Sequence, residues 1–184
     1  MIQERDLRVG DGRDLPDLIN RYGVAIVALP EPIEGRERFN AGVINISLYT
    51  KIQQLIGNLI SVHFGAHIFT RDQFINVRSG LTEKTGYHQD YRSDAPAAFL
   101  TAWTPLNEEG PWLHVFAKKF TSAVVGSDEE ILRHYRDHLI RYQPKMGEVV
   151  LMDGRTVHGT GDCVGNPHGI RVSLDFRIRL TCSP

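Results

Sequence analysis

The chain has 184 residues, enough for one domain with a continuous core, and its 41% apolar and 23% charged content is that of an ordinary globular protein. The formal net charge of −1 gives no reason to expect nucleic acid or an anionic membrane as a partner. No apolar run approaches the roughly 20 residues that a membrane-spanning helix requires, and the N-terminal stretch has no apolar signal core. We therefore expect one cytoplasmic domain over residues 1–184, with Cys163 and Cys182 as reduced thiols.

Residues 1–66 are expected to form a helical support. Asp14 can cap a short helix that has Pro16 in its first turn and ends at Gly23. The apolar run at 24–29 then predicts a buried strand. Between 39 and 64, helical spacing predicts one long helix whose apolar face carries Ile44, Leu48, Ile52, Leu55, Leu59 and Val62.

Residues 67–184 change character, because short strands alternate with turns. Strands are expected at 73–78, 87–91, 99–104, 112–116, 148–152, 156–159 and 170–180. The last of these alternates apolar and polar residues, as a half-buried strand does. A helical insertion at about 121–145 begins with a capping box of Ser127 and Glu130. Its buried stripe is expected to be Ile131, Leu132, Tyr135 and Leu139. Short, numerous strands after helices predict a sandwich or barrel backed by helices.

One constellation of side chains indicates a metal site. His88 and Asp90 are two apart in a predicted strand, so their side chains share one face while Gln89 points elsewhere. A third ligand must come from another strand, and His158 ends a predicted strand before a glycine-rich turn. Two imidazoles and one carboxylate on one face of an ion describe a non-haem iron(II) site with open positions for co-substrate and dioxygen. Arg171, further along, can bind an acidic co-substrate through two hydrogen bonds.

Three segments carry a resemblance to a known family: GYHQDYRSDAPAAFLTAWTPLNEEGPWLHVF, GEVVLMDGRTVHGTG and IRVSLDFRI. Together they resemble the phytanoyl-CoA dioxygenase family of iron(II)/2-oxoglutarate oxygenases, over roughly residues 73–178. The resemblance implies a mainly β fold with N-terminal helices, a double-stranded β-helix or cupin-like jelly roll. It also implies that Fe(2+) is held by His88, Asp90 and His158, and that 2-oxoglutarate is bound by Arg171, Ser173, Thr160, Trp103 and Gln73. The residues alone leave Trp103 as a core residue and Thr160 as a turn cap equally open.

The expected function is an iron(II)- and 2-oxoglutarate-dependent dioxygenase that uses O2. It would hydroxylate a small-molecule metabolite or natural-product intermediate, with succinate and CO2 as co-products. Desaturation, cyclisation or epimerisation with the same cofactors stays open, as do a non-catalytic metal-binding jelly roll and a zinc hydrolase. Substrate contacts are expected from loops at the mouth, at Asn76, Arg78, Tyr87, Tyr91, Arg92, Trp112 and Lys118, with 121–145 as a candidate lid. The cations among them suit an acidic substrate or are surface charges, and the sequence makes no prediction of oligomeric state.

Overall fold

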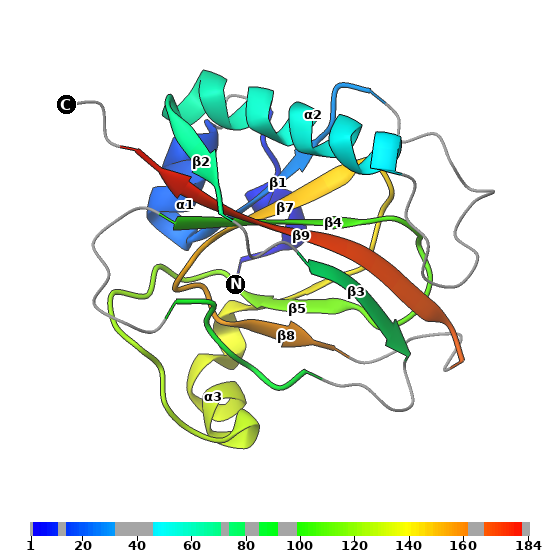
Figure 1. Cartoon of the computed structure of the whole chain (residues 1–184). Coiled ribbons are helices and arrows are strands. Elements are labelled where there is room, and N and C mark those ends of the chain that lie inside the picture. The colour runs from blue at the N-terminus through cyan, green and yellow to red at the C-terminus, as the bar shows by residue number, and fades with distance from the viewer. Residues whose placement is uncertain are drawn as a thin grey trace.

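The computed structural model describes residues 2–10, 14–31, 46–70, 74–79, 85–91, 99–161 and 168–181. Two antiparallel sheets face each other in it (Figure 1). The larger sheet runs in the order β1 (Val24–Ala28), β7 (Glu148–Asp153), β4 (Phe99–Pro105), β9 (Ile170–Leu180) and β2 (His67–Phe69), and β3 (Phe74–Ser79) also pairs with β9. The smaller sheet runs in the order β6 (Leu139–Tyr142), β5 (Leu113–Phe116) and β8 (His158–Thr160). The prediction of a helix-backed jelly roll is confirmed.

Two helices cover the outer face of the larger sheet, α1 (Leu15–Tyr22) and α2 (Ile46–Phe64) (Figure 1). Gly23 ends α1 in the left-handed conformation, with φ of 73°, as predicted. The Asp14 side chain makes no capping hydrogen bond, although its residue occupies the N-cap position. Ile52 and Ile60 lie on the buried stripe of α2, while Val62 is 79% exposed. Val62 was expected on this stripe, but it stands two residues, or about 200°, around the helix from Ile60.

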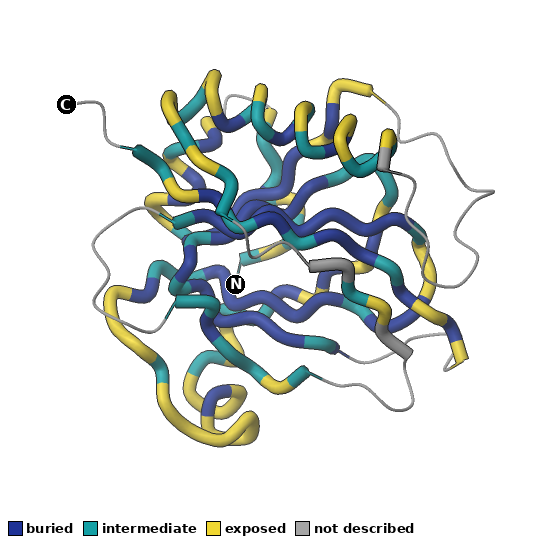
Figure 2. Tube along the Cα trace, viewed as in Figure 1, coloured by how far each residue is buried: buried dark blue, intermediate teal, exposed yellow. Residues whose placement is uncertain are grey.

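The faces of β9 decide where the functional site lies. Leu174, Phe176 and Ile178 pack under the helices in one buried cluster. The alternate positions carry polar side chains; Arg171 and Ser173 face the smaller sheet and are buried, whereas Arg179 near the strand's end is exposed. The alternation predicted a half-buried strand with one polar face, but both faces are covered over most of the strand (Figure 2). A polar stripe enclosed between two sheets provides binding groups in the interior.

Apolar side chains fill much of the space between the two sheets. The residues of both sheets that fill it include Trp103, Leu113, Val115, Val150 and Met152. The N-terminal segment closes this layer with η1 (Glu4–Leu7), whose Leu7 is fully buried. Just after it, the Arg8 guanidinium bonds both carboxylate oxygens of Glu148, at 2.6 and 3.2 Å. This ion pair attaches the start of the chain to β7.

Several segments differ from the sequence-based expectation. Residues 87–91 do not form a strand, because His88 makes only an isolated bridge to His158. The strand predicted at 24–29 is confirmed as β1, but it joins the larger sheet, so the segment 1–66 is not a purely helical support. The insertion expected at 121–145 contains α3 (Asp128–Tyr135) and η2 (Arg136–His138), and then β6 of the smaller sheet. The predicted capping box of α3 is confirmed, but Leu132 on its expected buried stripe is 38% exposed. Among the described helices, none combines the length and the hydropathy that crossing a lipid bilayer requires.

Candidate metal centre

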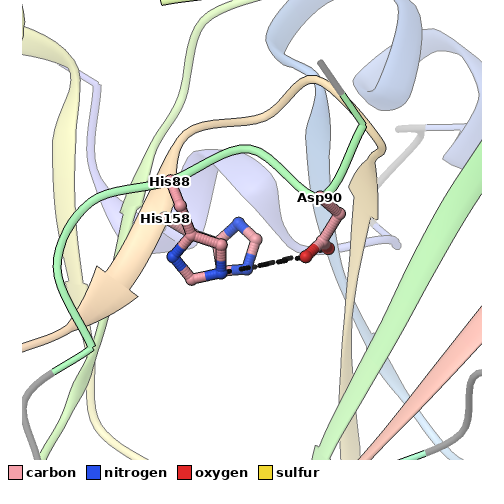
Figure 3. A group of neighbouring side chains, drawn as sticks. All are labelled: His88, Asp90 and His158. Atoms are coloured by element: carbon pink, nitrogen blue, oxygen red, sulfur yellow. Dashed lines mark ion pairs between the residues drawn. The ribbon is translucent and has the colours of Figure 1, made fainter. Parts of the chain in front are cut away.

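Three side chains converge at one edge of the smaller sheet. Figure 3 shows the rings of His88 and His158 facing the Asp90 carboxylate. One donor atom from each residue lies within 4.8 Å of the other two. The two imidazole Nε2 atoms each lie 3.8 Å from an Asp90 oxygen, His88 from Oδ1 and His158 from Oδ2. The structure therefore brings together the three residues that the sequence singled out as a ligand set.

A pair of backbone hydrogen bonds sets this convergence. The His88 amide donates to the His158 carbonyl at 2.9 Å, and the His158 amide donates back at 3.0 Å. This bridge places the segment carrying His88 beside β8, which carries His158. Asp90 points to the same side, while Gln89 is buried and forms its hydrogen bonds with backbone groups away from the three ligands. The alternation expected of a strand thus holds locally without a continuous strand.

Backbone carbonyls select the tautomer of both histidines. His88 Nδ1 lies 2.8 Å from the Gly86 carbonyl oxygen, and His158 Nδ1 lies 3.0 Å from that of Thr156. A carbonyl oxygen only accepts, so each Nδ1 carries a proton, and in the neutral ring this leaves the Nε2 lone pair for the cluster. Burial lowers the pKa of His158 from its ordinary value, which favours the neutral ring that a metal needs.

The Asp90 carboxylate is held from the opposite sheet. Its side chain is 4% exposed, and its Oδ2 accepts hydrogen bonds from Thr101 Oγ1, at 2.5 Å, and from Arg177 Nη1. Arg177 also donates to Thr101 Oγ1 at 2.6 Å, and the two are direct cross-strand partners on β4 and β9. With Oδ2 engaged in this way, Oδ1 is the oxygen that faces His88. These two supporting residues were not predicted for this role. Arg177 could have been found from its shared face with Arg171 on β9, whereas nothing in the sequence marks Thr101.

A cavity of about 200 Å³ opens beside the cluster. Its described lining is Asn76, Thr85, His88, Trp103, Leu113, His158, Gly159, Thr160, Arg171, Asp175 and Arg177. The lining combines two arginines and one apolar wall with two of the three clustered ligands. The sequence did not predict Thr85, Leu113 or Asp175 as cavity residues, although Asp175 lies on the same face of β9 as Arg171.

Arg171 is held deep in this cavity, at 3% exposure. Its Nη1 donates to the carbonyl oxygens of Pro111, at 2.7 Å, and Trp112, at 3.2 Å, and its Cζ lies 5.2 Å from the centre of the Trp103 ring. The loop that supplies these carbonyls needs glycine at 110, where φ is +80° and a Cβ would collide with the backbone nitrogen of Arg171. A guanidinium fixed at this depth is oriented in advance for an anion.

The other predicted site residues fall into three groups. Trp103, Thr160 and Asn76 line the cavity, and Ser173 lies on the same face of β9 with its hydroxyl fully buried and without a hydrogen-bond partner in the described parts of the chain. Gln73, Arg92 and the side chain of Arg78 lie outside the described residues. The described cavity lining does not include Tyr87, Tyr91, Trp112 or Lys118.

Those four residues have other contacts. The Tyr87 hydroxyl lies 2.9 Å from His114 Nδ1, and the Tyr91 ring stacks on Phe99 at 4.1 Å. Lys118 Nζ lies 5.6 Å from the Tyr135 ring centre. Trp112 contributes its carbonyl oxygen, which accepts from Arg171.

The fold is a double-stranded β-helix, and a cluster of two histidines and one aspartate, His88, Asp90 and His158, lies between its sheets. No protein-family model matches the chain, and no curated protein matches it significantly. Solved structures do share its fold. The non-heme alpha ketoglutarate dependent carbocyclase SnoK from nogalamycin biosynthesis superposes with a TM-score of 0.64 at 16% identity, over 89% of this chain and 81% of SnoK.

Two further structures extend the comparison. EvdO2 from Micromonospora carbonacea var. aurantiaca, complexed with 2-oxoglutarate, has a TM-score of 0.60 at 14% identity, over 96% of this chain and 95% of its own. The epimerase SnoN, in complex with Fe3+, alpha ketoglutarate and nogalamycin RO, has a TM-score of 0.60 at 14% identity, over 89% of this chain and 81% of its own. At these identities the similarity establishes a shared fold.

Proposed function

We propose that this protein is an iron(II)- and 2-oxoglutarate-dependent oxygenase acting on a small molecule. The observation that carries the proposal is the meeting of His88, Asp90 and His158 within 4.8 Å beside a cavity that Arg171 also lines. Two imidazoles and a carboxylate suit iron(II) and leave open coordination positions. A buried guanidinium in the same cavity suits a co-substrate with a free carboxylate.

The rival readings fit these residues less well. A zinc hydrolase could use the same three ligands, but it has no need of the Arg171 guanidinium beside them. A structural metal site is normally closed by four protein ligands, whereas this cluster of three borders a cavity. The combination of an incomplete ligand set and a nearby anion site favours an oxygenase.

Three side chains would hold the metal, and the others would orient the co-substrate. Iron with 2-oxoglutarate and O2 bound would supply the oxidation, releasing succinate and CO2. His88 and His158 would present Nε2 because their Nδ1 protons are bound to carbonyls, and Asp90 would present Oδ1. Arg171 would bind the distal carboxylate of 2-oxoglutarate, with the buried Ser173 hydroxyl and the Thr160 hydroxyl as further donors. Trp103 would form an apolar wall that excludes water.

Hydroxylation of a metabolite or natural-product intermediate is the first candidate outcome. A second candidate is ring closure or epimerisation with the same cofactors, because SnoK is a carbocyclase and SnoN an epimerase. Product mass separates them: hydroxylation adds one oxygen, ring closure or desaturation removes two hydrogens, and epimerisation leaves the mass unchanged. Among described residues, Asn76, Thr85 and Asp175 are the cavity groups we propose for substrate contact.

The test is a screen of small metabolites for stimulated succinate formation. The protein is loaded with iron without oxygen, given 2-oxoglutarate and a candidate substrate, and then exposed to air. Asp90→Ala should abolish succinate release, while Asp137→Ala, at a carboxylate 78% exposed on η2, should not change it. Succinate release that survives Asp90→Ala would rule out this ligand assignment. Turnover that needs zinc and consumes no oxygen would favour the hydrolase.

A further inference from the structure

One peptide group beside the metal centre is hydrogen-bonded at both ends. The carbonyl of Gly86 receives the Nδ1 proton of His88 at 2.8 Å. The amide of the same peptide unit, which belongs to Tyr87, donates to Asp128 Oδ1 at 2.8 Å. A trans peptide points its N–H and C=O in opposite directions, so the three groups form one continuous chain. Asp128, the first residue of α3, is thereby connected to a predicted iron ligand.

The fit around this peptide is close. A Cβ at Gly86 would lie 3.1 Å from both carboxylate oxygens of Asp128, so a side chain there would crowd the carboxylate and shift it by a few tenths of an ångström. The Tyr87 side chain is held by His114, whose Nδ1 lies 2.9 Å from the tyrosine hydroxyl. Besides its bond to His88, the peptide group is thus held by Asp128 and, through the Tyr87 side chain, by His114.

A second connection joins the same two segments. The Gln89 side chain makes this connection: its Nε2 donates to the Ser122 carbonyl at 3.2 Å, and its Oε1 accepts from the backbone amide of Val124 at 2.7 Å. Gln89 is 5% exposed and lies between His88 and Asp90 in the chain. The stretch from Ser122 to Asp128 thus contacts the ligand segment at two points, one on each side of His88.

We propose that Asp128 is a positioning residue for His88, acting through the Gly86–Tyr87 peptide group, and that residues 122–128 brace the metal centre. This inference rests on the proposed iron site. The negative charge of Asp128 polarises the peptide, and hydrogen bonds linked in a chain strengthen one another. A stronger acceptor at Gly86 both fixes the His88 ring and makes its Nε2 a better donor to metal. The stretch 122–128 then acts as a fixed support, whereas the sequence had suggested a lid over 121–145.

The experiment measures cobalt(II) binding to the full-length protein by its visible absorption, with cobalt(II) as an oxygen-stable probe for iron(II). Asp128→Ala should weaken cobalt binding about tenfold, the lower end of the range for loss of an outer partner, because the Asp128–Tyr87 bond is exposed. Asp128→Asn keeps an acceptor oxygen but removes the charge, so it should recover only part of the affinity. Glu129→Ala, which removes a neighbouring exposed charge from the same turn of α3, is the matched control and should bind cobalt as the parent does.

A magnetic-resonance readout separates positioning from general loosening. In the cobalt protein, each ligand histidine should give one exchangeable Nδ1–H signal shifted by the metal. Asp128→Ala should speed the solvent exchange of the His88 signal and leave the His158 signal unchanged, because His158 donates to a different carbonyl, that of Thr156. Equal cobalt affinity in Asp128→Ala and the parent, or equal weakening in Glu129→Ala, would overturn the positioning role. Failure of the parent protein to bind cobalt would instead overturn the proposed iron site, and this inference with it.

Discussion

Replacing Thr101 with valine tests how the Asp90 carboxylate is held, because valine keeps the shape of threonine and removes its hydroxyl. Thr101 is 1% exposed, and its Oγ1 both donates to Asp90 and accepts from Arg177. A hydrogen bond to a charged group contributes about 1.5–3 kcal/mol to stability. Both partners are buried here, so the loss should approach that range rather than the smaller values of exposed pairs.

The expected effects are a lower unfolding temperature and weaker metal binding. For a chain of this size, the loss of stability corresponds to about 3–12 °C in the melting temperature of the metal-free protein, followed by circular dichroism. Cobalt(II) affinity should fall about tenfold, because a second partner that orients a ligand is lost. Thr101→Ser restores the hydroxyl and should recover most of both properties.

Thr104→Val on the same strand is the matched control. Its hydroxyl is also buried, but it donates to the neutral carbonyl of Glu148 at 2.9 Å, away from the metal centre. The control should cost about 0.5–1.5 kcal/mol and leave cobalt binding unchanged. If Thr101→Val had the same melting temperature and the same cobalt affinity as the parent protein, the inference that this hydroxyl positions Asp90 would be wrong.

Three further predictions follow from the same structure. Arg171→Ala should raise the 2-oxoglutarate concentration needed for half-maximal succinate formation at least tenfold. Arg171→Lys should reverse only part of this rise, because an ammonium cannot bind a carboxylate through a planar fork. If Arg171→Ala left this concentration unchanged, another residue would bind the co-substrate carboxylate. Gly110→Ala should destabilise the protein by about 1–3 kcal/mol, because the φ of +80° at this position is strained for alanine. It should also raise the 2-oxoglutarate concentration needed for half-maximal activity, because the alanine methyl group would displace Arg171. A melting temperature equal to that of the parent protein would contradict this. Glu148→Gln should lower the free energy of unfolding by about 1–2 kcal/mol, because it removes the charge that Arg8 and the Tyr142 hydroxyl bind in a partly exposed pair. Denaturant unfolding measures this loss. Cobalt affinity should not change, and a change would show that the two regions are coupled.

Much of the local structure is encoded in short-range patterns. Gly23 ends α1, and Ser127 with Glu130 begins α3, because the backbone conformations and hydrogen bonds involved lie within a few residues. The alternation in residues 170–180 predicts β9 with its observed bounds. The spacing of His88 and Asp90 likewise predicts that the two side chains share a side, and they do so even though residues 87–91 form no strand.

The sequence by itself therefore determined the class of fold, the pair of neighbouring ligands and the presence of a polar stripe on β9. Only the tertiary structure decided that this stripe faces the interior, because that depends on α2 and the smaller sheet covering opposite faces of the larger one. The same is true of Arg177, which reaches Asp90 across 87 positions of chain. Periodicity specifies which side chains share a face, but what lies opposite that face is set by packing between distant segments.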